Sequence, residues 1–172
     1  AWTADIRFDP NGLAASSIDV TIDLTSATIE SGDVSNTQLV GVDGFDTANH
    51  AAAQFSSRDI SEADGGGYLA NGDLNIRGIT RPVALPFTLE IADGVGRASG
   101  ALTIDRTAFN VGTDADAQAS FVDKEVTVSL DIVADRDGDP LPPPAAPAWT
   151  LLPQDSTLTF AFGFQGGTVE GA

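Results

Sequence analysis

The chain reads YLANGDLNIRGITRPVALPFTLEI over residues 68–91. Apolar and polar side chains alternate in both halves of this stretch, as they do in a strand that buries one face. A Gly-containing turn, residues 77–80, separates the halves. The stretch therefore predicts an antiparallel hairpin of two long strands. Pro82 and Pro86 fall in or beside the second strand, and because proline donates no backbone hydrogen bond, they predict an edge, a bulge or a strand beginning there.

The same period of two residues recurs along the chain. Ile18, Val20, Ile22 and Leu24 fall on one face of a predicted strand. Further strands are predicted at residues 6–8, 54–60, 98–107, 126–132 and 156–163. Helix is scarce, and one short helix is predicted over residues 34–41. Eight strands with turn signals between them are typical of an all-β barrel or sandwich.

Composition excludes several classes of function. The 172 residues carry 8 basic and 25 acidic side chains, a net charge of −17. Nucleic acids and anionic membrane surfaces are bound through basic faces, so neither is expected as a partner. The absence of cysteine excludes disulfides, iron–sulfur clusters, thiolate zinc sites and covalently attached haem. Apolar residues make up 42% of the chain, which is enough for a sizeable core.

Proline marks a break in organisation near the C-terminal end. Residues 135–148 form a proline-rich linker that cannot join the interior of a sheet. Strand-like sequence resumes at Trp149 and continues to residue 172. The acidic start of the linker, Asp135 to Asp139, matches only half of a calcium-binding loop, because the twelfth loop position is Ala146 rather than a carboxylate. No metal site is predicted there.

Four motifs resemble those of the YceI-like family, which comprises polyisoprenoid-binding, lipocalin-like β-barrels. Residues 71–83 resemble the signature G-D-L-x-I-x-G-x-T-x-x-V, and residues 104–112 resemble I-x-R-x-x-F-G-hydrophobic-G with Asn110 in place of glycine. Residues 44–57 are similar to the segment F-D…P-x-x-x-F-x-S, although Ala51 replaces the usual proline. Residues 122–128 resemble the final strand. The resemblance implies an eight-stranded antiparallel lipocalin-like barrel with a short helix.

The order of the motifs differs from that of the family. The opening motif, W-x-h-x-x-x-x-S-x-h-x-F, stands last, at residues 149–160. The segment that normally follows it stands first, at residues 2–10. We therefore expect a circularly permuted barrel, with its main part in residues 1–134 and its first strands in residues 149–172. Either the chain is an intramolecular permutant, or it is a slice of tandem barrels, in which case domain swapping would make homo-oligomers.

The resemblance implies a function as well as a fold. It implies binding, carriage or storage of an isoprenoid lipid, a polyprenyl chain or the tail of a quinone such as ubiquinone, in a periplasmic or secreted protein. The alternative is a quinone-binding accessory domain that is tethered to a membrane cytochrome and takes part in electron transfer. No covalent cofactor is expected. Catalysis is not expected either, because the single histidine, His50, is not accompanied by a nucleophile motif.

Candidate ligand-binding residues are aromatic, with one exception. Phenylalanines expected to line the cavity are Phe45, Phe55, Phe87, Phe109, Phe160 and Phe162. Each ring could equally serve to fill the core. Arg106 shares the inward face of its strand with Leu102 and Ile104 and would either meet a ligand headgroup or tie down a loop through backbone carbonyls or a carboxylate.

Overall fold

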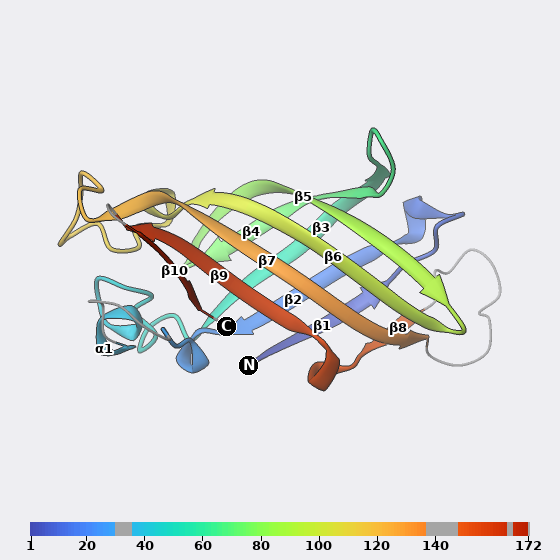
Figure 1. Ribbon diagram of the computed structural model, residues 1–172, viewed down its shortest axis with the longest axis horizontal. Coiled ribbons are helices and arrows are strands. Elements are labelled where there is room, and N and C mark those ends of the chain that lie inside the picture. The colour runs from blue at the N-terminus through green and yellow to red at the C-terminus, as the bar shows by residue number, and fades with distance from the viewer. Residues whose placement is uncertain (30–35, 137–147, 165–166, 172) are drawn as a thin grey trace.

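The computed structural model describes residues 1–29, 36–136, 148–164 and 167–171, the backbone alone being described from residue 160 onward. Ten strands form one antiparallel sheet that curls into a barrel (Figure 1). The strands are β1 Trp2–Arg7, β2 Ser17–Asp23, β3 Ala52–Glu62, β4 Tyr68–Ile76, β5 Ile79–Ala92, β6 Val95–Asp105, β7 Val122–Arg136, β8 Ala148–Leu151, β9 Thr157–Phe164 and β10 Gly167–Gly171. One α-helix, α1 Asn36–Val40, lies within the range predicted for it. Four short 3-10 helices are η1 Leu13–Ala15, η2 Leu24–Ser26, η3 Arg106–Phe109 and η4 Pro153–Asp155.

The barrel is closed by β8, which pairs with β1 through one edge and with β7 through the other. Strands β1 to β7 each pair with the next strand in the chain. Both β8 and β9 pair with β7, so the two lie end to end and together form the eighth strand of the barrel. Strand β10 folds back on β9 as a hairpin. The predicted eight-stranded antiparallel barrel is therefore confirmed, and the linker residues 137–147 lie outside the described residues.

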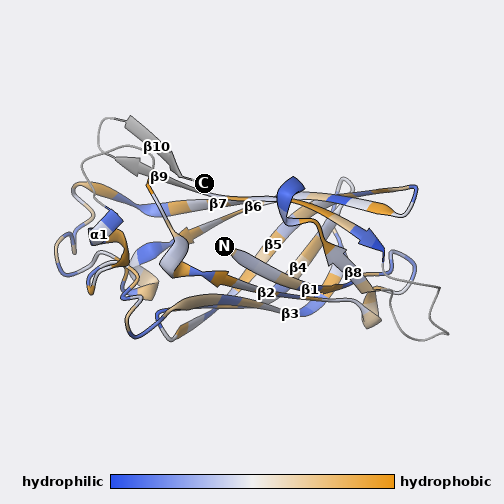
Figure 2. Cartoon of the chain, turned by 90° about the horizontal axis from the view of Figure 1, so that it is seen from below, coloured by the Kyte–Doolittle hydropathy of each residue, from blue (hydrophilic) through white to orange (hydrophobic). Residues whose placement is uncertain are grey.

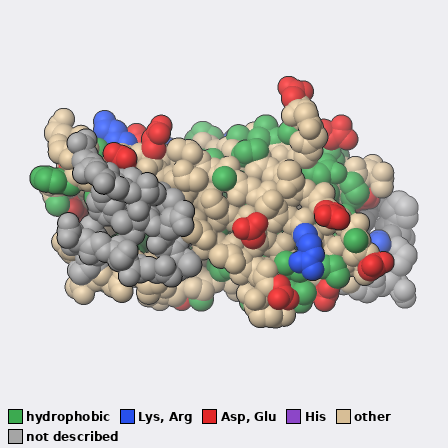
Figure 3. Space-filling model, in the orientation of Figure 1, with side chains coloured by type: hydrophobic (Ala, Val, Ile, Leu, Met, Phe, Trp, Pro, Cys, Tyr) green, Lys and Arg blue, Asp and Glu red, His purple; other side chains and the backbone are tan. Residues whose placement is uncertain are grey.

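Hydrophobic and hydrophilic residues alternate along strands of the barrel (Figure 2). In β4, Ala70, Gly72, Leu74 and Ile76 are buried, while Asn71, Asp73 and Asn75 between them are more exposed. The outer face of β6 and β7 carries hydroxyl side chains, and Thr103 and Thr127 meet there across the strands. Uncharged polar groups and backbone accordingly dominate this side of the molecule, with acidic side chains set apart from one another (Figure 3).

Two tight turns fix the register of the central hairpins. Arg77 and Gly78 both have positive φ angles, 52° and 73°, and connect β4 to β5. Asp93 and Gly94 do the same between β5 and β6, with φ angles of 52° and 80°. Two consecutive residues of positive φ are typical of the hairpin turn whose twist matches that of the strands. The hairpin predicted from residues 68–91 is thus confirmed with its turn.

The two prolines of β5 lie where that strand has a neighbour on one side only. Strand β5 pairs with β4 over Ile79–Phe87, and its ladder with β6 covers only Phe87–Ala92. Pro82 and Pro86 precede that ladder, so their missing N–H groups cost no hydrogen bond to β6. The strand is therefore an edge locally, although it lies inside the sheet as a whole. No helix in the described part of the chain is long and apolar enough to cross a membrane.

Candidate lipid-binding cavity

Strand β1 is only partly paired along the edge that faces β8 and β9. It pairs with β2 along its whole length, but with β8 only through Ile6 and Arg7. Between β8 and β9 the chain turns through η4, which begins at Pro153. Proline has no N–H to give to a ladder, and a 3-10 turn breaks the extended geometry that pairing needs. The wall of the barrel therefore opens beside η4.

An apolar cleft of about 230 Å³ lies at this opening. Its walls come from β1, β2, η2, α1, the segment after α1 and β9. The apolar side chains of the lining are Trp2, Ile22, Leu24, Leu39, Phe45 and Leu158. Leu24, at 2% exposed, belongs to the core, so the cleft reaches from the surface to the interior of the barrel. Such a cleft suits an apolar ligand that enters from the side.

A second, smaller cavity of about 70 Å³ lies inside the barrel toward β8. Its lining is apolar and includes Phe8, Ile18, Leu85, Phe87, Ile132 and Trp149. Leu130 in this lining is the register partner of Leu158, which lines the cleft, so the linings of the two spaces meet at the β7–β9 ladder. Within the part of the chain that the structure describes, no three His, Asp or Glu side chains gather as metal ligands would.

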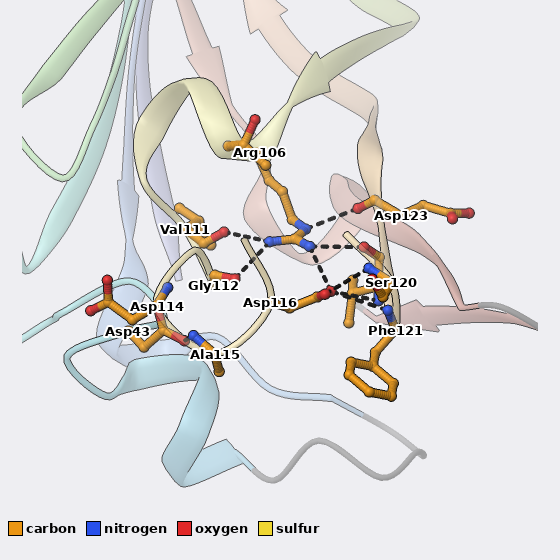
Figure 4. A network of polar contacts seen from close by, with 12 residues as sticks. Asp43, Arg106, Val111, Gly112, Asp114, Ala115, Asp116, Ser120, Phe121 and Asp123 are labelled. Carbon is orange, nitrogen blue, oxygen red and sulfur yellow. Dashed lines mark hydrogen bonds and ion pairs between the residues drawn. The ribbon is translucent and has the colours of Figure 1, made fainter. Parts of the chain in front are cut away.

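Arg106 begins η3 and is 4% exposed, but it faces a loop instead of a cavity (Figure 4). Its Nε donates to the carbonyl of Asp123 at 2.9 Å. Its Nη1 donates to the carbonyls of Val111 and Gly112, and its Nη2 to the carbonyl of Val122 and a carboxylate oxygen of Asp116. A guanidinium has five N–H donors, so all of them are used within this loop. The sequence allowed Arg106 either to bind a ligand headgroup or to tie down a loop. The hydrogen bonds of its guanidinium are those of the second role.

Asp116 completes the loop from the other side. Its carboxylate accepts backbone N–H groups from Ser120, Phe121 and Val122, besides the bond from Arg106. The hydrogen bond from Val122 is the largest of several effects that hold the pKa of Asp116 below its ordinary value, and they outweigh the opposing effect of burial. The segment between η3 and β7 is thus held by an ionised carboxylate at its centre.

Comparison with known proteins agrees with this architecture. The model of the YceI-like domain matches residues 1–134. The chain belongs to the YceI-like family. A solved structure of Burkholderia cenocepacia BcnA is similar to this chain, with 34% identity and a TM-score of 0.73. The match covers 78% of this chain and 84% of the BcnA chain.

Other solved YceI-like structures show the same fold at lower identity. The Campylobacter jejuni YceI protein has 20% identity and a TM-score of 0.68, covering 80% of this chain and 82% of its own. A mutant of that protein with a monobromobimane guest structure has 19% identity, the same coverage and the same TM-score. No curated protein matches the chain significantly. Proteins with this barrel are generally binding proteins rather than enzymes. The family match ends at residue 134, so the circularly permuted order of the motifs stays a prediction.

The phenylalanines expected in the YceI-like cavity separate into three groups. Phe45 lines the cleft and Phe87 lines the inner cavity. Phe55 and Phe109 are buried in the core, at 7% and 2% exposed, and neither cavity has them in its lining. Phe160 and Phe162 have no described side chains; the register of β9 sets their backbones opposite Val128 and Val126 of β7. Trp2, Leu24, Leu39 and Leu158 line the cleft but were not among the expected site residues.

Acidification tests the loop that Asp116 holds. Because the pKa of Asp116 is lowered on folding, its contribution to stability is fully present above the ordinary carboxyl pKa of about 3.9 and is lost as the pH falls through the lowered value. We expect Asp116→Asn to lower the urea midpoint most at pH 7, with the difference from wild type shrinking below about pH 4. Urea unfolding of both proteins, followed by circular dichroism at pH 7 and below about pH 4, measures this difference in midpoint. Asp114→Asn, a change in the same loop, is the control, and a difference for Asp116→Asn that is constant with pH would contradict the assignment.

Proposed function

We propose that the barrel binds the apolar tail of an isoprenoid lipid, a polyprenyl chain or the tail of a quinone, and carries or stores it without bond-making chemistry. The observation that carries the proposal is the apolar cleft beside η4, which reaches the barrel core and adjoins the inner cavity. The YceI-like resemblance, which implies polyisoprenoid binding, supports the choice of an isoprenoid over other apolar ligands. Each CH₂ group that moves from water into such a space contributes about 0.8 kcal/mol, so a branched hydrocarbon tail needs no polar partner to bind.

Charge around the cleft favours a neutral headgroup. Asp23 is the one charged side chain among the described residues of the lining, where the ammonium group of Ala1 also lies. The hydrogen bond from the hydroxyl of Thr25 is the main reason that the pKa of Asp23 lies below the ordinary value. The net charge of −17 on the whole chain repels a diphosphate. The donors of Arg106 are used within its own loop. We therefore favour a polyprenol or a quinone over a polyprenyl diphosphate.

Placing a charge in the cleft tests the proposal. Leu158 lines the cleft and is half-buried, so Leu158→Asp introduces a carboxylate where a tail would lie while leaving the core in place. We expect at least about a tenfold loss of affinity for farnesol, because an unpaired charge against a hydrocarbon costs well over the 1.4 kcal/mol that a factor of ten represents. Competition against the uncharged dye N-phenylnaphthylamine measures the affinity, and native mass spectrometry identifies any lipid that co-purifies.

Controls separate a loss of binding from a loss of folding. Val42→Asp, at a residue that is 72% exposed and outside the cleft, should bind like wild type. Phe87→Asp should also lose lipid, provided that circular dichroism shows an intact barrel. Retention of extracted lipid at the wild-type ratio, together with an unchanged affinity of Leu158→Asp for farnesol, would rule out the cleft as the binding site.

A further inference from the structure

We propose that four aromatic rings at the β8 end of the barrel, those of Phe8, Tyr68, Phe87 and Trp149, form an end-stop that limits the length of tail the barrel accepts. This inference rests on the proposed function, since it assigns a specificity to the same cavity. Three of the rings come from β4, β5 and β8, and Phe8 follows directly after β1. The end-stop therefore joins strands from opposite sides of the barrel.

Trp149 is held in place by two contacts. It is 7% exposed, and its indole Nε1 donates a hydrogen bond to the carbonyl of Phe8 at 3.1 Å. The ring lies over Gly96 of β6, where a Cβ would stand 3.1 Å from it. Because that distance is tighter than a normal carbon contact, a side chain at position 96 would push the ring aside. The absence of a side chain there lets the ring of Trp149 pack against the inner face of β6.

The other three rings pack against one another. The ring centroids of Phe8 and Tyr68 are 4.9 Å apart in an edge-to-face arrangement, and those of Tyr68 and Phe87 are 5.4 Å apart in a stacked one. Phe8 and Phe87 meet edge to face at 6.0 Å. All three pairs fall within the range in which aromatic contacts add stability beyond their buried area. A ring set of this kind does not move aside for a ligand without losing those contacts.

A second glycine allows β6 to approach β5 closely at Phe87. Gly100 of β6 is the register partner of Phe87, and a Cβ at that position would stand 3.1 Å from the Phe87 Cβ and 2.6 Å from the carbonyl oxygen of Pro86. Two glycines of β6 thus stand beside two residues of the end-stop, Gly96 beside Trp149 and Gly100 beside Phe87.

The sizes of the cleft and of the inner cavity explain why the packed rings would limit the length of the tail. The cavity among the rings measures about 70 Å³, far below the roughly 300 Å³ at the lower end of ligand pockets. The cleft beside η4, at about 230 Å³, offers the larger space. A short prenyl tail fills the cleft and the part of the cavity that adjoins it. A longer tail meets the rings and leaves its last units in water, where they add no affinity.

Binding of prenols of increasing length tests the end-stop. In the wild-type chain, affinity should rise from geraniol to farnesol and then change less than about threefold from farnesol to geranylgeraniol. An isoprene unit that is fully buried would instead raise affinity more than about tenfold. Trp149→Ala removes the ring that packs over Gly96. In that variant, geranylgeraniol should bind at least about tenfold more tightly than farnesol. Native mass spectrometry and dye competition on the full chain give both affinities.

Two further variants keep the outcome decisive. Trp149→Phe retains a ring and should keep the wild-type preference. Phe87→Leu opens the end-stop at a second place and provides the same test if Trp149→Ala does not fold. A tenfold gain from farnesol to geranylgeraniol in the wild-type chain, or no change of preference in either opened variant, would overturn the end-stop while leaving the proposed function intact. Failure of every prenol to bind the wild-type chain would overturn both.

Discussion

Deleting residues 149–172 should abolish cooperative folding. Strand β8 pairs with β1 and β7 at once, so its removal leaves two unpaired edges in a sheet that is otherwise closed. The deletion also removes Trp149, and losing a buried Trp alone costs about 3–5 kcal/mol. Because a domain of this size has a stability of about 5–15 kcal/mol in total, this loss together with that of the β7–β9 ladder exceeds what the rest of the barrel can sustain. Thermal unfolding followed by circular dichroism, with light scattering for aggregation, measures the result.

Cleavage of the linker is the matched control for the deletion. A protease site inserted near Pro143 allows the chain to be cut without removing any strand, and the two pieces should stay associated through the β7, β8 and β9 contacts. The size of the uncut chain at different concentrations separates the two origins of the chain order: an intramolecular permutant stays monomeric, whereas a swapped slice forms dimers or longer chains. A truncated 1–135 chain that melted cooperatively at the full-length temperature would contradict the role assigned to residues 149–172.

Strand positions followed from the sequence because alternation is a local signal. The hairpin of β4 and β5 lies where residues 68–91 predict it, and its turn lies at Arg77 and Gly78. Alternation alone left a barrel and a sandwich both open, and the choice of a closed barrel came from the resemblance to the YceI-like family. The structure extends several strands beyond the predicted ranges, as in β7, which runs from Val122 to Arg136. Strand ends depend on cross-strand partners, and the alternation of one strand carries no information about them.

The cavity was only partly predictable, because it depends on contacts between distant segments. Phe45 and Phe87 were expected to line it and do so, yet Phe55 looks the same in sequence and packs into the core. The cleft arises where η4 interrupts pairing with β1, and this juxtaposes residues 2 and 158, which are far apart in the chain. Trp149 was recognised only as an aromatic of a strand motif. Its position over Gly96 depends on the register between β6, β7 and β8, which the sequence does not specify.

The predicted circular order has a counterpart in the edges of the sheet. Strand β10 pairs with the outer edge of β9, over Phe160 to Phe164, and β1 pairs with the same edge of the β8–β9 line at Ala148 and Trp149. In the usual order of the family motifs, the segment matching β10 is followed by the one matching β1. In a permuted barrel, β10 and β1 should follow one another along the same edge of the β8–β9 line. The pairings of β10 with β9 and of β1 with β8 have this arrangement. The order itself stays a prediction, which the linker experiment addresses.

Replacing Arg106 with leucine should destabilise the barrel without a direct effect on its affinity for farnesol. The substitution leaves four backbone carbonyls and the carboxylate of Asp116 without the donors that hold them. Removing one partner of a buried ion pair costs about 3–5 kcal/mol, so we expect a loss of that size in the free energy of unfolding. Urea unfolding measures the loss, and hydrogen exchange at the amides of Ser120, Phe121 and Val122 should locate it, because Asp116 no longer has a fixed position from which to accept their bonds.

Arg106→Lys is the informative companion to this variant. Lysine keeps the positive charge but has a single ammonium group with three donors, which cannot reach carbonyls on both sides of the loop as the five donors of the guanidinium do. It should therefore recover only a small part of the lost stability. Farnesol affinity per folded molecule should be close to wild type in both variants, since Arg106 lines neither the cleft nor the inner cavity. A variant that kept its stability and exchange protection but lost its lipid would instead make Arg106 a headgroup ligand, and the loop-tying role would be wrong.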